Sequence, residues 1–141
     1  MKVLLDTNIV LDLLLEREPF IEETIAIFEE IEQGNIEAYI AATTVTNIFY
    51  IIRKNKSREV ALIAVKRLLI GLQLCPVNLQ VIEVALDINL RDFEDSVQLA
   101  CATVNQLTAI ITRDTKDFVE SPLPIYSPAE CLYRVKTNKL D

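Results

Sequence analysis

A short apolar run that stops at an aspartate opens the chain and constrains its fold more than any other feature. Residues 3–5 are Val-Leu-Leu and predict a buried strand, which Asp6 ends before a Thr7-Asn8 pair that suits a helix start. In open α/β sheets, ligands bind outside the carboxyl ends of the strands. The sequence therefore predicts that Asp6 lies at the functional edge of a parallel sheet.

Apolar periodicity along the rest of the chain predicts strands that alternate with helices. Strands are expected near residues 2–6, 36–40, 72–75, 109–112 and 125–126, and helices near 8–15, 19–32, 43–53, 57–70, 79–90, 92–105 and 129–135. Such alternation is typical of a parallel sheet covered by helices on both faces. With 141 residues, we expect one domain, 1–141, folded as a three-layer α/β/α sandwich around a central parallel sheet of about four to five strands.

Composition excludes several classes of protein. A hydrophobic content of 51% argues against a disordered chain, and two glycines are too few for a Gly-rich phosphate loop. Three widely spaced cysteines without any histidine argue against structural zinc and indicate reduced core thiols, as in the cytoplasm. Acidic residues interrupt the first apolar run, so no signal peptide or membrane span is expected, and the predicted localisation is cytoplasmic.

Two further groups of acids resemble the setting of Asp6. Asp114 and Asp117 follow the predicted strand at 109–112, and Asp92 and Asp95 share one face of a predicted helix start. Carboxylate oxygens without imidazole suit a hard divalent cation such as Mg²⁺. If the sheet edge gathers these acids, the sequence predicts an oxygen-only metal site.

Each of these acids also has a simpler structural interpretation. Asp6 suits a helix cap, Asp92 and Asp95 suit a capping box, and Asp114 suits a turn. We expect Glu94 to point into solvent. An ionised carboxylate at the mouth of a sheet is costly to desolvate unless a cation compensates it, which favours the metal site.

Charge is distributed unevenly along the chain, whose net charge is −7. Residues 1–37 hold ten acids against two basic residues, whereas residues 53–67 hold six basic residues against one acid. The basic segment either solvates a helix–turn–helix surface or binds a polyanion. If it binds a polyanion, we expect Arg53, Lys54, Lys56 and Arg58 to contact the phosphates.

Taken in order, these motifs resemble the signatures of the PIN-domain family over nearly the whole chain. They are Val-Leu-Leu-Asp-Thr-Asn at 3–8, Asp-Phe-Glu-Asp at 92–95 followed by Ala100 and Ala102, and Ile-Thr-Arg-Asp-Thr-Lys-Asp-Phe at 111–118. The resemblance implies a metal-dependent ribonuclease using Mg²⁺ or Mn²⁺. RNA is then the polyanion whose backbone Arg53, Lys54, Lys56 and Arg58 are expected to bind. Small members of the family include VapC-type toxins that an antitoxin protein silences, and the family often forms homodimers.

The resemblance also assigns roles to individual residues. Asp6, Asp95 and Asp114 match the family's metal-binding acids, and Asp117 matches an auxiliary acid, so these four are the expected catalytic residues. Further auxiliary roles are expected for Asp92, Asn8 and Thr112.

One position departs from the family pattern. A second acid is usual in the helix after the second strand, but residues 38–58 contain no aspartate or glutamate, and Asn47 stands about where that acid belongs. An amide oxygen is a weaker ligand for Mg²⁺ than a carboxylate. Asn47 is therefore an expected auxiliary residue and the main difference from the family.

Two alternatives to an RNA-hydrolysing toxin remain open at this point. One is a PIN scaffold, catalytically weakened by Asn47, that binds RNA or protein. The other is an aspartyl-phosphate phosphotransfer domain, because Asp6 also ends the first strand. Phosphatases of that kind need an acid where this chain has Asn8, and receiver domains need acids paired with Asp6.

Overall fold

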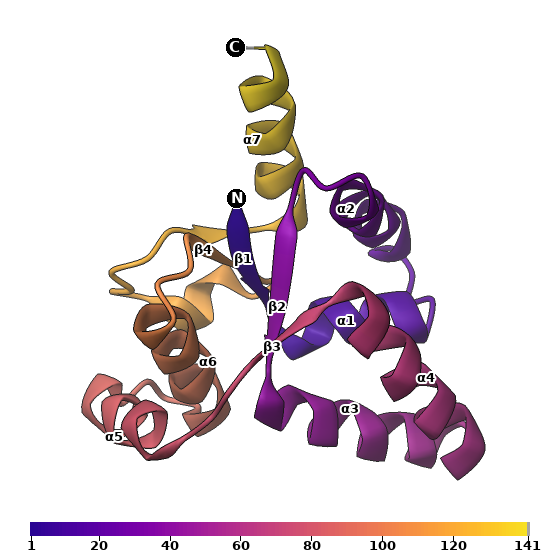
Figure 1. The fold of residues 1–141 in the computed structure, drawn as a ribbon, viewed down its shortest axis with the longest axis horizontal. Helices are drawn as coiled ribbons and strands as arrows, with labels where there is room; N and C mark the ends of the chain where they lie inside the picture. Colours follow the sequence, from indigo (N-terminus) through magenta and orange to yellow (C-terminus); the bar gives the residue numbers. More distant parts are fainter. Residues whose placement is uncertain (141) are drawn as a thin grey trace.

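A five-stranded parallel sheet forms the centre of the molecule (Figure 1). The structure is a computed structural model that describes residues 1–140, with side chains through residue 138. Its strands are β1 (Lys2–Leu5), β2 (Glu37–Ala41), β3 (Gln73–Cys75), β4 (Ala109–Ile111) and β5 (Ile125–Tyr126), in the order β3-β2-β1-β4-β5. All four pairings are parallel. The first strand of the chain is therefore the central one, and all carboxyl ends lie on one edge.

Helices cover both faces of the sheet. They are α1 (Thr7–Leu14), α2 (Ile21–Glu32), α3 (Ala42–Asn55), α4 (Arg58–Gly71), α5 (Leu79–Ile88), α6 (Phe93–Val104) and α7 (Pro128–Leu140), with a 3₁₀ helix η1 (Thr115–Phe118). One core joins α1, α2, α3, α4 and α7 to the sheet, and a second joins α5 and α6 to its other face (Figure 1). The predicted three-layer α/β/α sandwich is confirmed.

Alternation along β1 explains how one short strand serves both cores. Val3 and Leu5 belong to the first core and Leu4 to the second, and none of the three is exposed to solvent. Successive side chains of a strand point to opposite faces, so a continuous apolar run is what a doubly covered strand requires. Burial of each side chain stabilises the fold by about 1.5–3 kcal/mol.

A few elements differ from the sequence-based expectations. The second helix begins at Ile21, two residues after Pro19, and the last helix runs to Leu140 rather than ending near residue 135. The 3₁₀ turn at 115–118 was not expected. Cys75, Cys101 and Cys131 are free and buried, as expected for core thiols. Within residues 1–140, no helix is long and apolar enough to cross a membrane.

Candidate active site

Asp6 emerges from the end of β1 with its carboxylate held inside the protein. Its backbone N–H donates to the carbonyl of Ile111 at 3.0 Å, which fixes it between β1 and β4. The side chain is 6% exposed, and it accepts hydrogen bonds from Gln98 Nε2 at 3.0 Å and Thr112 Oγ1 at 2.7 Å. Asp6 occupies the N-cap position of α1, but its side chain makes no capping hydrogen bond, so capping does not account for the carboxylate.

Thr112 connects the ends of β1 and β4. Its hydroxyl donates to Asp6 and accepts from the backbone N–H of Asp114 at 3.0 Å. Asp114 in turn accepts a hydrogen bond from Asn8 Nδ2 at 2.9 Å, although its side chain is exposed. The two expected auxiliary residues, Asn8 and Thr112, therefore tie Asp6 and Asp114 to one edge of the sheet.

The beginning of α6 supplies the other acids. Asp92 caps the helix by accepting from the backbone N–H of Asp95 at 3.1 Å, so capping is the correct interpretation for Asp92. That bond leaves the Asp95 carboxylate free to face the sheet edge. Glu94 does not point into solvent as expected, because Thr7 Oγ1 donates to its Oε1 at 2.8 Å.

Asp95 is the acid whose pKa is raised most clearly by its acidic neighbours. Burial, followed by the negative charges of Asp6, Asp92, Asp117 and Glu94, raises its pKa to about 7. Burial also raises the pKa of Asp6, although the hydrogen bonds from Thr112 and Gln98 oppose this. Five carboxylates from three parts of the chain thus share one region, and Asp95 is at its centre.

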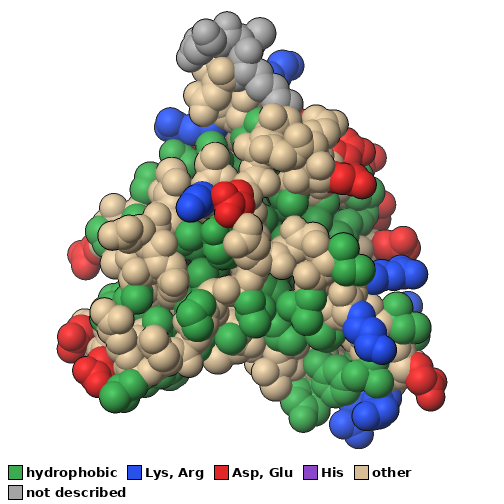
Figure 2. All heavy atoms as spheres, in the orientation of Figure 1, with side chains coloured by type: hydrophobic (Ala, Val, Ile, Leu, Met, Phe, Trp, Pro, Cys, Tyr) green, Lys and Arg blue, Asp and Glu red, His purple; other side chains and the backbone are tan. Residues whose placement is uncertain are grey.

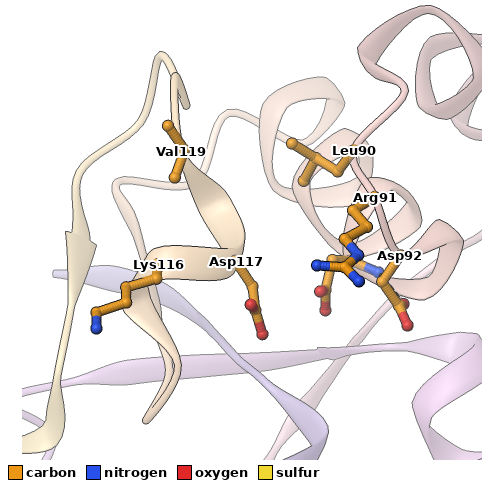
Figure 3. A pocket seen from close by; sticks show the side chains of 7 residues that line it. Leu90, Arg91, Asp92, Lys116, Asp117 and Val119 are labelled. Atoms are coloured by element: carbon orange, nitrogen blue, oxygen red, sulfur yellow. Dashed lines mark hydrogen bonds between the residues drawn. The ribbon is translucent and has the colours of Figure 1, made fainter.

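A cavity of about 670 Å³ opens beside these acids (Figure 3). It is lined by Leu90, Arg91, Asp92, Asp95, Lys116, Asp117 and Val119. Arg91 and Asp117 extend into it from opposite sides (Figure 3). The cavity therefore combines acids that attract a cation with basic side chains that attract a phosphate.

The donor set of this region fits a hard divalent cation. All candidate ligands are oxygens, and two amide oxygens at the site, Asn8 Oδ1 and Gln98 Oε1, are buried without a hydrogen-bond partner. In the described part of the chain, no three acidic or cysteine side chains are already gathered closely enough to hold an ion. The chemistry of the donors thus suits Mg²⁺ or Mn²⁺, and binding would require the carboxylates to move closer together.

The relationship to known proteins follows from the sequence itself. A family model described as the PIN domain matches residues 2–116, which is most of the chain. The chain belongs to the PIN-domain family. No curated protein is significantly similar to it in sequence. Membership of the PIN-domain family removes the basis for the aspartyl-phosphate alternative.

Solved structures share this PIN-domain fold. VapBC2 from Rickettsia felis, bound to a DNA fragment of its promoter, has a TM-score of 0.73 at 16% identity, covering 90% of this chain and 98% of that one. A toxin–antitoxin complex from Klebsiella pneumoniae has a TM-score of 0.67 at 23% identity, covering 89% and 97%. Mycobacterium tuberculosis VapC20, a sarcin–ricin loop cleaving toxin, has a TM-score of 0.61 at 10% identity, covering 77% and 86%. At these identities the similarity is one of fold.

Asn47 belongs to α3, the helix that follows β2. It is half-buried on α3, one turn beyond Thr44, and it makes no side-chain hydrogen bond among residues 1–138. Thr44 is buried and lies 3.2 Å from Thr7, Oγ1 to Oγ1. The start of α3 therefore reaches the acid region through Thr7, and no hydrogen bond joins Asn47 to the acids within the described residues.

The predicted RNA-binding residues lie away from the acids. Arg53, Lys54, Lys56 and Arg58 are exposed at the end of α3 and the start of α4, where basic side chains gather at the lower right (Figure 2). Arg53 is nine residues beyond Thr44, or about 14 Å along the helix. The outline of the molecule is notched between the part formed by α5 and α6 and the part formed by α3 and α4 (Figures 1 and 2).

Sequence reasoning missed the polar network that holds the site together. Arg113 Nε donates to Asp12 Oδ2 at 2.6 Å, Nη2 donates to Oδ1 at 3.3 Å, and the guanidinium lies 3.9 Å from the centre of the Phe20 ring. This ion pair ties α1 to the loop that carries Thr112 and Asp114. In the sequence, this ion pair was indicated only by Asp12, an aspartate on the apolar face of the helix at residues 7–14.

The raised pKa of Asp95 predicts how the metal-free PIN domain responds to pH. An unfolded aspartate loses its proton near 3.8, whereas the folded protein retains it to about 7. Protonated Asp95 therefore stabilises the fold at low pH, and this contribution is lost as the pH rises from about 4 to about 7. We expect the Tm in EDTA to fall between pH 5 and pH 7.5, and the fall to be smaller in Asp95→Asn. A parallel decline in both proteins would contradict the assignment.

Proposed function

We propose that this PIN domain is a metal-dependent endoribonuclease that acts as the toxin of a toxin–antitoxin pair. The observation that carries the proposal is the mutual repulsion around Asp95, whose carboxyl shares the edge of the sheet with Asp6, Asp92, Asp117 and Glu94. Uncompensated carboxylates are an unfavourable arrangement unless a cation joins them. Membership of the PIN-domain family makes RNA the proposed substrate.

In this proposal, Asp6, Asp95 and Asp114 hold Mg²⁺ or Mn²⁺, and Asp117 assists at the rim of the cavity. A bound divalent ion would lower the pKa of a water and neutralise charge that develops on the phosphate. Gln98 and Thr112 fix the orientation of Asp6 through their hydrogen bonds. Arg91 and Lys116 border the cavity and provide the positive charge that orients the phosphodiester.

The reaction is tested directly with purified protein and a mixed RNA pool. Cleavage is expected in Mg²⁺ or Mn²⁺ and is expected to stop in EDTA, leaving 5′-phosphate ends. Those ends distinguish hydrolysis by a metal-activated water from attack by the ribose 2′-hydroxyl. Cleavage that continues unchanged in EDTA would contradict the proposal.

Backbone contacts with RNA are proposed for Arg53, Lys54, Lys56 and Arg58, at the end of α3 and the start of α4. Phosphate contacts release counterions, so affinity falls with salt by about 0.7 log units per contact for each log unit of salt. The double variant Lys54→Gln/Lys56→Gln is expected to reduce this slope by about 1.4. Fluorescence anisotropy of a labelled single strand measures it. Equal slopes in the variant and the parent would show that the cluster only solvates the surface.

An antitoxin is the proposed protein partner. Between α1, the end of α3 and α4 lies an apolar groove of about 220 Å³, lined by Leu14, Leu15, Ile52, Lys56, Val60, Ile63, Ala64 and Arg67. Val60 and Ile63 are about half exposed, and the two basic residues at the rim favour an acidic amphipathic segment. Ile63→Asp is expected to abolish co-purification with the product of the adjacent reading frame, whereas Ile25→Asp on α2 is expected to retain it. Retention by both variants would place the partner elsewhere.

Self-association is also proposed. Leu79 and Leu86 on α5 are 73% and 62% exposed, which is unusual for large apolar side chains that repeat along one helix. We expect a homodimer through this helix, and sedimentation measures it. A monomer at about 50 µM, well within the micromolar range in which exposed apolar surfaces associate, would contradict it.

A catalytically weakened scaffold is the second candidate, and Asn47 is the observation that favours it. The side of the site formed by α3 contributes an amide where PIN domains usually contribute a carboxylate. A scaffold of this kind would bind RNA without cleaving it and would show no stabilisation by millimolar Mn²⁺. Metal titration followed by the cleavage assay separates the two candidates.

A further inference from the structure

The side of the site formed by α3 lacks an acid on its own helix, but a carboxylate from another element approaches it. Asn47 is neutral, and the nearest buried polar residue of α3 is Thr44. Thr44 Oγ1 lies 3.2 Å from Thr7 Oγ1, and Thr7 donates to Glu94 Oε1 at 2.8 Å. Through this chain of contacts, Glu94 of α6 reaches the junction of α1 and α3.

The placement of Glu94 on α6 directs it toward Asp6. Residues three and four positions apart share a helix face, so Glu94 and Asp95 both lie on the face of Gln98. Gln98 is 1% exposed and donates from Nε2 to Asp6 Oδ1 at 3.0 Å. The charge of Glu94 also acts on both Asp6 and Asp95. Glu94 therefore extends the acid centre toward α3.

An unpartnered oxygen at the same place indicates a ligand. Gln98 Oε1 is buried and has no hydrogen-bond donor, although the other end of the same amide holds Asp6. A buried acceptor without a partner is energetically unfavourable. Water molecules in the coordination shell of a divalent ion are donors, and an ion beside Asp6 would bring one to this oxygen.

We propose that Glu94 supplies the carboxylate that Asn47 does not, and so completes the metal-binding set from α6 instead of from α3. This inference rests on the proposed function, since it adds a ligand to the same site. Thr7 holds one oxygen of Glu94 in place, and Oε2 makes no hydrogen bond within residues 1–138. The acid that the PIN-domain pattern expects at position 47 is then present in space, although it is absent from its usual place in the sequence.

The test is the affinity for Mn²⁺, measured by the electron paramagnetic resonance signal of the free ion. Glu94→Gln retains an oxygen that accepts from Thr7 but removes the charge, and we expect Mn²⁺ to bind it about 10–100-fold more weakly. Glu83→Gln, an exposed residue on α5 outside the site, is the matched control and is expected to bind as the parent does. The loss of Mn²⁺ affinity in Glu94→Gln must persist in 1 M KCl. At that salt concentration the Debye length is about 3 Å, so the effect of a charge that does not touch the ion is screened.

A second pair of variants tests whether Glu94 replaces the acid missing at position 47. Asn47→Asp is expected to increase Mn²⁺ affinity more in the Glu94→Gln background than in the parent, because only the former has a vacant ligand position. An equal increase in Mn²⁺ affinity in the two backgrounds would show that positions 47 and 94 act independently, and would overturn the inference.

The outcomes separate this inference from the proposed function. Parent-like Mn²⁺ affinity in Glu94→Gln, with binding lost in Asp6→Asn, would overturn the role of Glu94 and leave the nuclease proposal intact. A Glu94→Gln defect that disappears in 1 M KCl would also overturn it. If Asp6→Asn binds Mn²⁺ as the parent does, or if neither binds the ion, the proposed metal site fails and the role of Glu94 fails with it.

Discussion

Asp6→Asn is expected to lower RNA cleavage by about 100-fold or more and to remove most of the thermal stabilisation by Mn²⁺. Loss of a residue that only orients a ligand already costs about 10–100-fold, and Asp6 is itself a proposed ligand. At an Mn²⁺ concentration 100 times the Kd, mass action stabilises the parent by about 2.7 kcal/mol. For a chain of this size that corresponds to a rise in Tm of roughly 5–10 °C. Differential scanning fluorimetry measures the shift.

The comparison with EDTA shows whether the fold survives the substitution. Burial raises the pKa of Asp6, so its charged form is disfavoured in the folded state, and replacing it with a neutral side chain of the same shape is not expected to lower the Tm in EDTA. Asp87→Asn, at an exposed position on α5, serves as the control. If Mn²⁺ raises the Tm of Asp6→Asn as much as that of the parent, the assignment of the metal site is wrong.

Arg113→Met is expected to destabilise the protein by about 3 kcal/mol. The Asp12 side chain is fully buried, and Arg113 is its closest partner, since Arg17 Nη1 lies 3.7 Å from Oδ1. Removing one member of a buried pair leaves the other charge uncompensated, which costs about 3–5 kcal/mol. The lower value applies because 23% of the Arg113 side chain is exposed. The measurement is the free energy of unfolding in urea.

Double substitution distinguishes the ion pair from simple packing. In Asp12→Leu/Arg113→Met no charge is left buried, so we expect the double variant to be more stable than Arg113→Met alone. Lys116→Met, in the same loop but exposed, is expected to change stability by less than about 0.5 kcal/mol. A similarly small change for Arg113→Met would mean that solvent screens the Asp12–Arg113 pair.

The fold was largely predictable because local patterns determine its elements. The apolar run at residues 3–5 carries the signal of a strand buried on both faces, and Ser57 and Asn78 accept from the backbone N–H groups of Val60 and Val81 at the helix starts. The 3₁₀ turn after Asp114 was missed because four residues are too few to show a period. Tertiary contacts rather than propensity determine such short elements.

The site was only partly predictable, because its members meet through contacts between distant parts of the chain. The edge position of Asp6 followed from the end of β1. The contacts of Gln98 and Glu94 could not be predicted, because they depend on how α6 is rotated against the sheet. Gln98 lies 92 residues from its partner Asp6, and Glu94 lies 87 residues from its partner Thr7. No pattern within a single helix specifies those pairs.

The central position of β1 has a consequence for when the candidate site is assembled during synthesis. Thr112 lies 106 residues after the Asp6 carboxylate that it orients, and β4, the neighbour of β1, precedes Thr112 directly. At about 5–20 residues per second, translation leaves the first strand without that neighbour for roughly 5–20 s. Under the proposed function, nascent chains are therefore expected to be inert toward the RNA around them, including the message being read. Stalled chains released after residue 108 are expected to show no cleavage, whereas the released full-length chain cleaves RNA.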